Sequence, residues 1–360
     1  MNNILYIGRY NGIVGGIERY MQKSAELLRR NGFSVQYLYI ENSGREQENF
    51  AGSFECIAEF TPESPLISAA DIIIIHNIIP TEQLKILPEK KTFFFAHDHN
   101  IYCQRHHYYY PVGRINCHRK RTPFLCKLCS LGRNEAPPLE EYRKYPALVL
   151  SDFMAGNLYK NGFEKVFKLP AFIKTAAKKR TFLPDGILRI LFLGQLIRGK
   201  GADLMLKTLS KLDIPFMCTV AGDGKDRPML EKMVETLKLD DKVRFLGFVS
   251  APEKLWADCD VFVFPIRWQE PFGLVGLEAM AHGVPVVAFD RGGVREWLID
   301  NKNGFAIPEG ADPGLVLKRM FDHPEHFFNR MSRAGTDLAE EKFSEEMFIK
   351  KFNELCEVLK

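Results

Sequence analysis

The segment QEPFGLVGLEAMAHGVPVV carries two glutamates, Glu270 and Glu278, separated only by Pro271, glycines and apolar residues. Because a proline disfavours helical backbone at the residue before it, Glu270 is expected in a loop. LVGLEAMAHG is expected to form a short helix that holds Glu278 in its second turn. Carboxylates accept hydrogen bonds from sugar hydroxyls, often two at once. Two plainer interpretations stay open: Glu278 as a helix carboxylate paired with an arginine, and Glu270 as a solvated loop residue.

Three glycine-rich segments each lead into an expected helix: GGIER (15–19), GQLIRGKG (194–201) and AGDGKDRP (221–228). Glycine lets a ligand approach the backbone, and a helix N-terminus offers unpaired N–H groups with a partial positive charge. With Arg198 and Lys200 alongside, the expected ligand is a phosphate or diphosphate. The glycines could instead serve only tight strand-to-helix turns. No GxxxxGK[ST] motif is present, and no GxGxxG follows ILYIG, which disfavours a nicotinamide dehydrogenase.

The apolar pattern of the chain predicts the strands and helices that position these loops. Short apolar runs alternate with helical segments in both halves of the chain, which is typical of doubly wound parallel sheets. The length of 360 residues also favours two domains. We expect a first Rossmann-like domain over 1–170, a linker over 171–186 and a second Rossmann-like domain over 187–340. An amphipathic helix in 341–360 should pack back toward the first domain. Ligands of such sheets bind beyond the carboxyl ends of the strands, here in a cleft that the two domains face.

The bulk composition is that of a soluble globular protein, with 46% apolar and 26% charged residues. No apolar run is long enough for a transmembrane helix, which needs about 18 residues or more. The N-terminal MNNILYIGRY predicts a first strand rather than a signal peptide. We therefore expect a cytoplasmic protein whose eight cysteines do not form a disulfide framework.

An insert at about 98–135 is unusually long for a loop, and long ordered loops are usually functional. From His99 to Asn134 it holds seven basic residues and no acidic one, although the whole chain carries a net charge of only +4. Aromatic residues interleave with the cations. This pattern predicts an anionic partner, such as a lipid-linked acceptor at the inner face of the plasma membrane. A merely solvated basic loop is the alternative.

Four cysteines lie in this insert, and CKLC has the two-residue gap of a zinc knuckle. A structural zinc would order a loop that has no core of its own. Free thiols without metal are the alternative, since the first spacing is long and irregular. The expected ligands are Cys103, Cys117, Cys126 and Cys129, with His118 as a substitute.

The block from VRFLGFVS through FVFPIRWQEPFGLVGLEAMAHGVPVVAFDRGGVREWLIDNKNGF resembles the retaining nucleotide-sugar glycosyltransferases of family four, which have the GT-B fold. The resemblance covers about residues 187–320. The family's E-x7-E element reads here as Glu270 and Glu278, GGIER resembles its glycine loop, and FFFAHD resembles its acceptor-side histidine strand. One departure is that Gln195 stands where the family usually has an arginine, so Arg198 is expected to supply the missing charge.

The resemblance implies that the donor is a nucleotide-diphosphate sugar, such as a UDP-sugar. It implies that Glu270 contacts the donor sugar, Glu278 the ribose and Lys200 the diphosphate, and that His97 lies near the reacting carbon. His97 is also one of five histidines in this part of the chain, and the plainer interpretation is that it has no special role. The implied catalytic residues are His97, Lys200 and Glu270, and the implied donor-binding residues are Gly15, Gly16, Gln195, Arg198, Lys200, Gly222, Val249, Glu270, Phe272, Gly273, Leu274, Val275 and Glu278.

The predicted function is therefore retaining transfer of a sugar to a hydroxyl acceptor in surface polysaccharide, lipopolysaccharide or glycolipid assembly, with no cofactor required for catalysis. Two alternatives within enzymes are a GT-B epimerase and a GT-B phosphorylase. A phosphorylase would need a pyridoxal phosphate lysine, which we cannot identify. The alternative from another class is a zinc-containing nucleic-acid-binding protein built on the basic insert, although it leaves the two glutamates unexplained and no nucleic acid is expected. The sequence does not reveal the base, the sugar or the acceptor.

Overall fold

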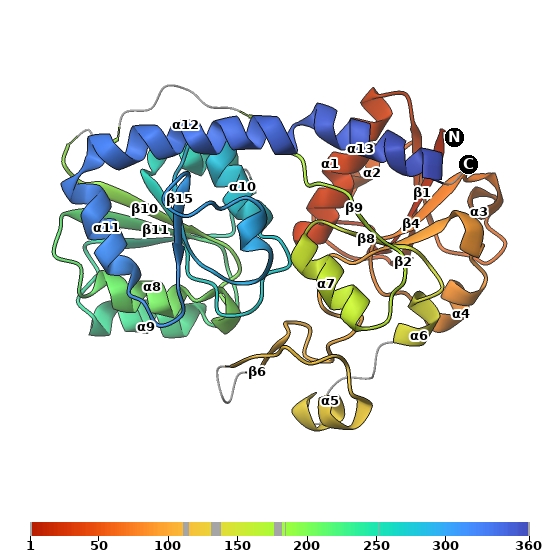
Figure 1. Cartoon of the computed structure of the whole chain (residues 1–360), viewed down its shortest axis with the longest axis horizontal. Helices are drawn as coiled ribbons and strands as arrows, with labels where there is room; N and C mark the ends of the chain where they lie inside the picture. The colour runs from red at the N-terminus through yellow and green to blue at the C-terminus, as the bar shows by residue number, and fades with distance from the viewer. Residues whose placement is uncertain are drawn as a thin grey trace. The chain divides into compact units, whose positions relative to one another are not determined.

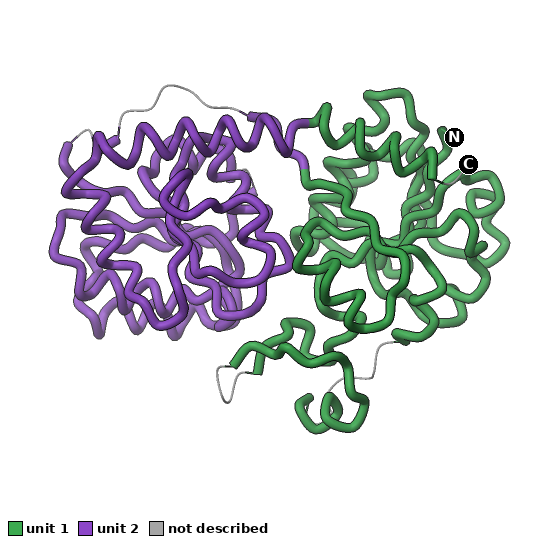
Figure 2. The backbone as a smooth tube through the Cα atoms, viewed as in Figure 1, with its two compact units in different colours: residues 1–171, 345–360 green, residues 172–344 purple. Residues whose placement is uncertain are grey.

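The computed structural model describes residues 2–110, 115–130, 138–175, 182–183, 185–250 and 252–358. The chain divides into two compact units, unit 1 with residues 1–171 and 345–360, and unit 2 with residues 172–344 (Figure 2). Each unit is built on its own parallel sheet with helices packed on it (Figure 1). The predicted α/β fold with two doubly wound parallel sheets is confirmed.

Unit 1 contains a seven-stranded sheet in the order β3-β2-β1-β4-β5-β8-β9. All its pairings are parallel. The central strands are apolar throughout because helices cover both faces of a parallel sheet, and the four isoleucines of β4 are all buried. The strands are β1 Asn3–Tyr10, β2 Ser34–Glu41, β3 Cys56–Glu59, β4 Ile72–Ile75, β5 Thr92–Phe95, β8 Ala147–Val149 and β9 Val166–Lys168.

The helices of unit 1 connect these strands, and α1 is the longest of those before the insert (Figure 1). It starts after its N-cap Gly15, whose N–H donates to the Glu18 carboxylate at 2.8 Å. The helices are α1 Gly16–Arg30, α2 Gln47–Gly52, α3 Pro65–Ala69, α4 Thr81–Lys85, the 3₁₀ turn η1 Glu89–Lys91, α6 Leu139–Tyr142 and α7 Asp152–Lys160.

The predicted insert contains an antiparallel hairpin and a helix. The hairpin pairs β6, Tyr109–Tyr110, with β7, Ile115–Asn116, and α5 spans Pro123–Ser130. The insert begins directly beyond the carboxyl end of β5, and α5 lies outside the layers of the sheet (Figure 1). Its residues 111–114 and 131–137 lie outside the described residues.

Unit 2 contains a six-stranded parallel sheet in the order β12-β11-β10-β13-β14-β15. Its strands are β10 Leu188–Leu193, β11 Phe216–Ala221, β12 Val243–Gly247, β13 Val261–Phe264, β14 Val286–Phe289 and β15 Gly304–Ile307. Its helices are η2 Arg198–Lys200, α8 Ala202–Leu209, α9 Arg227–Thr236, η3 Pro252–Asp258, α10 Leu274–Ala281, η4 Gly292–Glu296, α11 Pro313–Asp322 and α12 Pro324–Phe343.

The last helix, α13, spans Glu345–Val358 and belongs to unit 1 (Figure 2). Its Phe352 ring meets the Phe33 ring with centroids 5.4 Å apart, and Glu345 pairs with Arg30 of α1 at 2.9 Å. The predicted linker, 171–186, holds no helix or strand among its described residues, and 176–181 and 184 lie outside them. Among the described residues, no helix is both long enough and apolar enough to cross a membrane.

Strand order reverses at one place in each sheet, between β1 and β4 in unit 1 and between β10 and β13 in unit 2. Loops that leave neighbouring strands in opposite directions open a crevice at such a point, where ligands of parallel sheets bind. In unit 2 the two loops concerned are 194–201 and 265–273. They contain Lys200 and Glu270, so the fold brings together residues that are 70 positions apart.

Candidate functional site

Lys200 and Glu270 form an ion pair in unit 2, with Nζ and Oε2 3.0 Å apart. The side chains are 19% and 12% exposed, so both charges are largely removed from water while one side stays open. Trp268 completes the arrangement, because its Nε1 donates to the same Oε2 at 3.0 Å and its ring lies 5.0 Å from the Lys200 ammonium. A cation over an aromatic face is attracted by the ring quadrupole.

The loop of Lys200 is held against the loop of Glu270 by two glycines. A Cβ on Gly199 would lie 1.9 Å from the Trp268 ring, and one on Gly201 would lie 1.8 Å from the carbonyl oxygen of Pro265. Gly201 also has a φ of +77°, which other residues rarely adopt. Gly199 and Gly201 are therefore needed for the loop of Lys200 to pack this closely against the loop of Glu270.

Arg267 fixes these two loops to each other. It is 6% exposed, and its two terminal nitrogens bond both carboxylate oxygens of Asp203 at the start of α8. Its Nη1 also donates to the carbonyl of Arg198 at 3.0 Å, and its own N–H donates to the carbonyl of Gly199 at 2.8 Å. Arg267 was not among the residues predicted from the sequence; the available signal was a cation two residues after the buried segment VFVFP.

The backbone around Glu270 is similarly constrained. The Gly293 N–H donates to its carbonyl at 2.7 Å, and a Cβ on Gly292, whose φ is +65°, would lie 2.1 Å from that oxygen. Trp297 is buried, and its Nε1 donates to the Phe272 carbonyl at 2.7 Å. The loop is therefore anchored on both sides of Glu270, which leaves its carboxylate to Lys200 and Trp268.

Helix α10 begins directly after this loop, with Gly273 as its N-cap at a φ of +86°. No side chain caps the helix, and within the described residues the N–H groups of Leu274 and Val275 have no backbone partner. Such N–H groups and the partial positive charge of the helix end suit an anion. Glu278 lies in the second turn and is half-buried, as the sequence predicted.

Of the remaining predicted donor residues, Gly15 and Gly16 belong to unit 1, and the others lie on neighbouring loops of unit 2. Gln195 and Arg198 are exposed, and Val249 is half-buried two residues beyond β12. Gly222 has a packing reason to be glycine, because a Cβ there would lie 1.9 Å from the carbonyl oxygen of Gly194. A direct role of Gly222 at a phosphate stays a prediction.

In unit 1, His97 lies beyond the end of β5 and is paired with His76, which follows β4. His76 Nδ1 and His97 Nε2 are 2.9 Å apart. The Phe95 ring stacks on the imidazole of His97 with centroids 4.1 Å apart and planes inclined by 5°. Burial lowers the pKa of His97 to about 3, so the ring is neutral at ordinary pH. Among the described residues no protein group bonds to Nδ1 of this half-buried ring, which leaves that nitrogen for a ligand.

Two carboxyl groups lie near this histidine pair. Burial raises the pKa of Asp98 to about 6, and the charge of Glu18 adds to the rise. Glu18 is buried, and its carboxylate accepts the hydrogen bond from the Gly15 N–H. Gly16, by contrast, has a negative φ and open space where a Cβ would stand, so nothing in the protein requires a glycine there. Open backbone at the start of α1 is compatible with the predicted approach of a ligand.

The four insert cysteines do not form a zinc site in this structure. Among the described residues, no three or more His, Cys, Asp or Glu side chains are grouped to hold a metal ion. All four cysteines are half-buried and none is in a disulfide. The expected four-thiolate arrangement is therefore not assembled among the described residues. The spacing of CKLC places Cys126 and Cys129 on one side of α5, but Cys103 and Cys117 do not join them as a ligand group.

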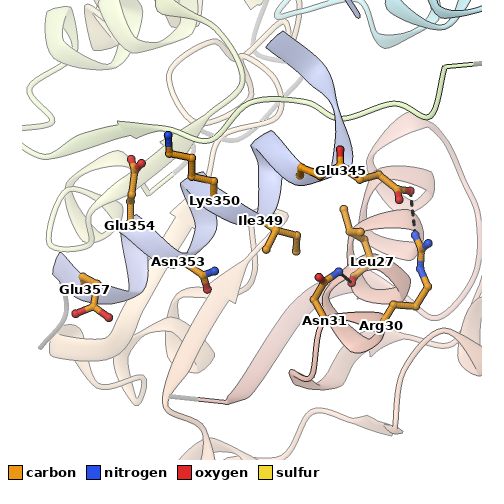
Figure 3. Close-up of a pocket in the computed structure, with 10 residues that line it drawn as sticks. Leu27, Arg30, Asn31, Glu345, Ile349, Lys350, Asn353, Glu354 and Glu357 are labelled. Carbon is orange, nitrogen blue, oxygen red and sulfur yellow. Dashed lines mark hydrogen bonds and ion pairs between the residues drawn. The ribbon is translucent and has the colours of Figure 1, made fainter. Parts of the chain in front are cut away.

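A separate groove of about 760 Å³ lies in unit 1 between α1 and α13 (Figure 3). Arg30, Glu345, Ile349 and Lys350 are among the side chains that line it, and none of its lining residues belongs to the predicted site. Arg30 and Glu345 are paired there, as the dashed line in Figure 3 marks. The groove is therefore not part of the predicted site.

Comparison with known proteins finds a family match within unit 2. Residues 173–320, which lie in unit 2, match the family model described as "Glycosyl transferases group 1". Mannosylfructose-phosphate synthase of Agrobacterium fabrum is 32% identical over 170 residues, which are 43% of this chain and 37% of that protein. The O-antigen biosynthesis glycosyltransferase WclY of Escherichia coli is 36% identical over 110 residues, 31% of each chain. The matched segments thus span only about a third of these relatives' length.

Among solved structures, Anabaena HepE in complex with UDP superposes with a TM-score of 0.77 at 16% identity, over 99% of this chain and 100% of that one. At this identity the similarity establishes the fold, which is GT-B. Unlike the family match, it extends over both units.

Proposed function

We propose that this protein is a retaining glycosyltransferase that moves a sugar from a nucleotide-diphosphate sugar to a hydroxyl acceptor. The observation that carries the proposal is the Lys200–Glu270 ion pair. It lies where the strand order of unit 2 reverses, beside the uncapped start of α10. A half-buried cation, a carboxylate and free helix N–H groups are the chemistry that a diphosphate and a sugar need. The match of residues 173–320 to group 1 glycosyl transferases supports it.

In this proposal the leaving diphosphate is stabilised by Lys200, Arg198 and the N–H groups at the start of α10. Negative charge develops on the diphosphate as the glycosidic bond breaks, and fixed positive groups aimed at that charge lower the barrier. Lys200 is already desolvated and positioned by Trp268. Arg198 lies on the same loop and is exposed, so it can turn toward the ligand.

Glu270 is assigned to the hydroxyls of the donor sugar, and Glu278 to those of the ribose. Both assignments follow the resemblance, and the anchored backbone around Glu270 supports the first. The backbone of Phe272, Gly273, Leu274 and Val275 would meet the sugar and diphosphate, and Val249 would lie by the base. Retention of configuration is likewise proposed from the resemblance.

His97 is assigned to the acceptor side of the reaction. A neutral imidazole with a free Nδ1 can donate to, or accept from, a hydroxyl without bringing a charge. The low pKa of His97 supports this neutral role over that of a cation.

For the finer identity of the substrates, the relatives give the only guide. Since HepE was solved with UDP, we propose a UDP-sugar donor; since WclY acts in O-antigen biosynthesis, we propose surface polysaccharide or glycolipid assembly in the cytoplasm. No part of the proposal requires a cofactor.

The test is release of nucleotide from a panel of UDP-, GDP- and ADP-sugars. We expect slow hydrolysis of one donor without acceptor, and its loss by two orders of magnitude or so in Glu270→Gln, the size expected for one aligned transition-state contact. Glu235→Gln, which changes an exposed carboxylate on α9, is the matched control and should keep full activity. The anomeric configuration of a transfer product, read by NMR, tests retention.

Donor hydrolysis that is unchanged in Glu270→Gln would overturn the assigned role. Absence of nucleotide release with every donor, together with salt-sensitive RNA or DNA binding, would favour the nucleic-acid-binding alternative instead. Arg198→Ala should weaken binding of the donor diphosphate by about tenfold or more, and near-normal affinity would remove Arg198 from the site.

A further inference from the structure

The insert exposes apolar side chains that a globular protein normally covers. Phe124, Leu125 and Leu128 of α5 are 73%, 42% and 58% exposed, and Ile115 of the neighbouring hairpin is 63% exposed. Single exposed apolar residues are ordinary, but a cluster within one segment marks a contact surface. These four residues lie within 14 positions of each other in the chain.

The exposed residues of α5 share one side of the helix. Phe124 and Leu128 are four residues apart and Leu125 and Leu128 three, the spacings that place side chains on one face. Cys126, Cys129 and Ser130 follow the same spacing and are half-buried or buried, so they form the opposite, inward face. The helix is therefore amphipathic, with its apolar side chains directed outward.

Contacts with the core of unit 1 and with α7 hold the insert in place. Tyr102 and Tyr108 are buried in the core of unit 1, and the Tyr108 hydroxyl donates to the carbonyl of Arg119. The Arg121 N–H donates to the Asn161 side chain at 2.7 Å, which ties the start of the helix to the end of α7. An isolated eight-residue helix is marginal in water, so these ties keep α5 in place although its outer face has no cover.

Exposed cations lie close to the exposed apolar residues in the chain. Arg119, Lys120 and Lys127 are all exposed, and no acidic residue occurs anywhere between His99 and Asn134. We call Ile115, Phe124, Leu125, Leu128, Arg119, Lys120 and Lys127 the insert surface. Exposed apolar side chains together with cations of the same segment match a medium that has acyl chains beneath anionic headgroups.

We propose that the insert surface docks on an anionic lipid bilayer, with Phe124 and Leu128 entering the acyl boundary. A second copy of this chain fits less well, because two such surfaces would place cations against cations. Nucleic acid also fits less well, since single strands are held by aromatic faces on which bases stack, whereas three of the four exposed apolar side chains are aliphatic.

The test uses the full chain and two vesicle preparations, phosphatidylcholine alone and equal parts of phosphatidylcholine and phosphatidylglycerol. We expect co-sedimentation with the anionic vesicles and little with the neutral ones. Replacing Phe124 and Leu128 together by serine should lower the affinity by about tenfold or more. Lys120→Gln with Lys127→Gln should lower it about fivefold per charge and flatten its dependence on salt.

Matched controls separate docking from general effects. Leu315→Ser changes a side chain that is 71% exposed on α11, and Lys254→Gln removes an exposed cation near η3; both should bind vesicles like the unaltered protein. Phe124→Trp provides a direct readout, because its fluorescence should shift to the blue and be quenched by brominated acyl chains. All the replaced side chains are exposed, so thermal unfolding should not change.

Vesicle binding is measured without donor or acceptor, so its result does not depend on the proposed enzymatic activity. The proposal would be overturned if the serine variant and the unaltered protein both bound the neutral and the anionic vesicles equally well. Phe124-dependent self-association without lipid binding would also overturn it, as would RNA binding that vesicles do not displace. Hydrolysis of a soluble donor should be the same in the serine variant and the unaltered protein.

Discussion

Nδ1 of His76 lies 2.9 Å from Nε2 of His97, so the residues that follow β4 and β5 share one hydrogen bond. Their ring centroids are 5.2 Å apart, which equals the nitrogen–nitrogen distance plus the distance from each centroid to its bonded nitrogen. The hydrogen bond therefore lies on the line that joins the two centroids. His76 is buried, and among the described residues this is the one hydrogen bond of its side chain, since its Nε2 has no partner. His76 thereby fixes the orientation of the His97 ring.

The first prediction concerns this pair and pH. Burial lowers the pKa of His97 to about 3 and that of His76 well below its usual value, so both protonate more readily in the unfolded chain. Below about pH 6.5 the unfolded state therefore binds more protons, and stability falls as pH falls, by at most about 1.4 kcal/mol per pH unit for each histidine. Asp98 and Glu18 have raised pKa values and act in the opposite direction.

Comparison of variants isolates the contribution of His76. In urea unfolding at pH 7.5 and pH 5.5, His76→Phe should lose less stability on acidification than the unaltered protein. Its turnover should also drop, while His76→Asn, which keeps a nitrogen near the position of Nδ1, should recover part of it. Equal acid sensitivity in His76→Phe and the unaltered protein would contradict the prediction.

The second prediction concerns the Arg267–Asp203 pair. Asp203→Ala leaves a buried guanidinium without its carboxylate, which costs about 3–5 kcal/mol in comparable buried pairs. The loop of Lys200 should also loosen, because Arg267 holds it through the carbonyls of Arg198 and Gly199. Urea unfolding and donor hydrolysis check the two effects.

The surface pair of Arg189 and Asp185 serves as the control for that experiment, since both side chains are substantially exposed. Asp185→Ala should change stability and activity little, because exposed ion pairs contribute little. A similar loss in both variants would mean that burial of the Arg267 pair is unimportant.

The third prediction concerns Gly292. An alanine there would have a φ of +65° and a Cβ 2.1 Å from the Glu270 carbonyl, so the loop of Glu270 must move. Gly310→Ala is matched for backbone strain, with a φ of +83° but open space around its Cβ. Both should lose about 1–2 kcal/mol from the left-handed backbone, but only Gly292→Ala should lose activity. Equal activity in the two variants would show that the loop tolerates the shift.

The fourth prediction separates the two glutamates. Glu278→Ala should mainly weaken binding of the free nucleotide, measured by calorimetry, because it is assigned to the ribose. Glu270→Ala should bind nucleotide nearly normally and lose turnover, since it is assigned to the sugar. The reverse pattern would overturn both assignments.

The sequence was sufficient for the elements that carry strong local signals. Continuous apolar runs such as IIII predicted the central strands, and Pro271 with Gly273 predicted the loop and helix around Glu270 and Glu278. It was not sufficient for the edge strands β3 and β9, which are short and half-exposed and therefore lack an apolar run.

Contacts between distant residues were the other limit. The partners of Lys200 and Arg267 lie 70 and 64 positions away in the chain, and no periodicity reports such distances. The cysteine spacing predicted a zinc site that the structure does not assemble, because spacing constrains Cys126 and Cys129 within one helix but not the two cysteines before it. His76 was hidden at the end of an apolar strand, and only the third dimension places it beside His97.

The membership of α13 in unit 1 has a consequence for how the protein is made. A ribosome synthesises all of unit 2 before it reaches Glu345, the first residue of α13. Unit 2 is therefore contiguous and can fold as soon as it emerges, whereas Phe33 of unit 1 meets Phe352 only after all of unit 2 has been synthesised. During that interval the Phe33 side chain of the nascent unit 1 lacks this apolar cover, and the surface around it is where chaperones would have most reason to bind.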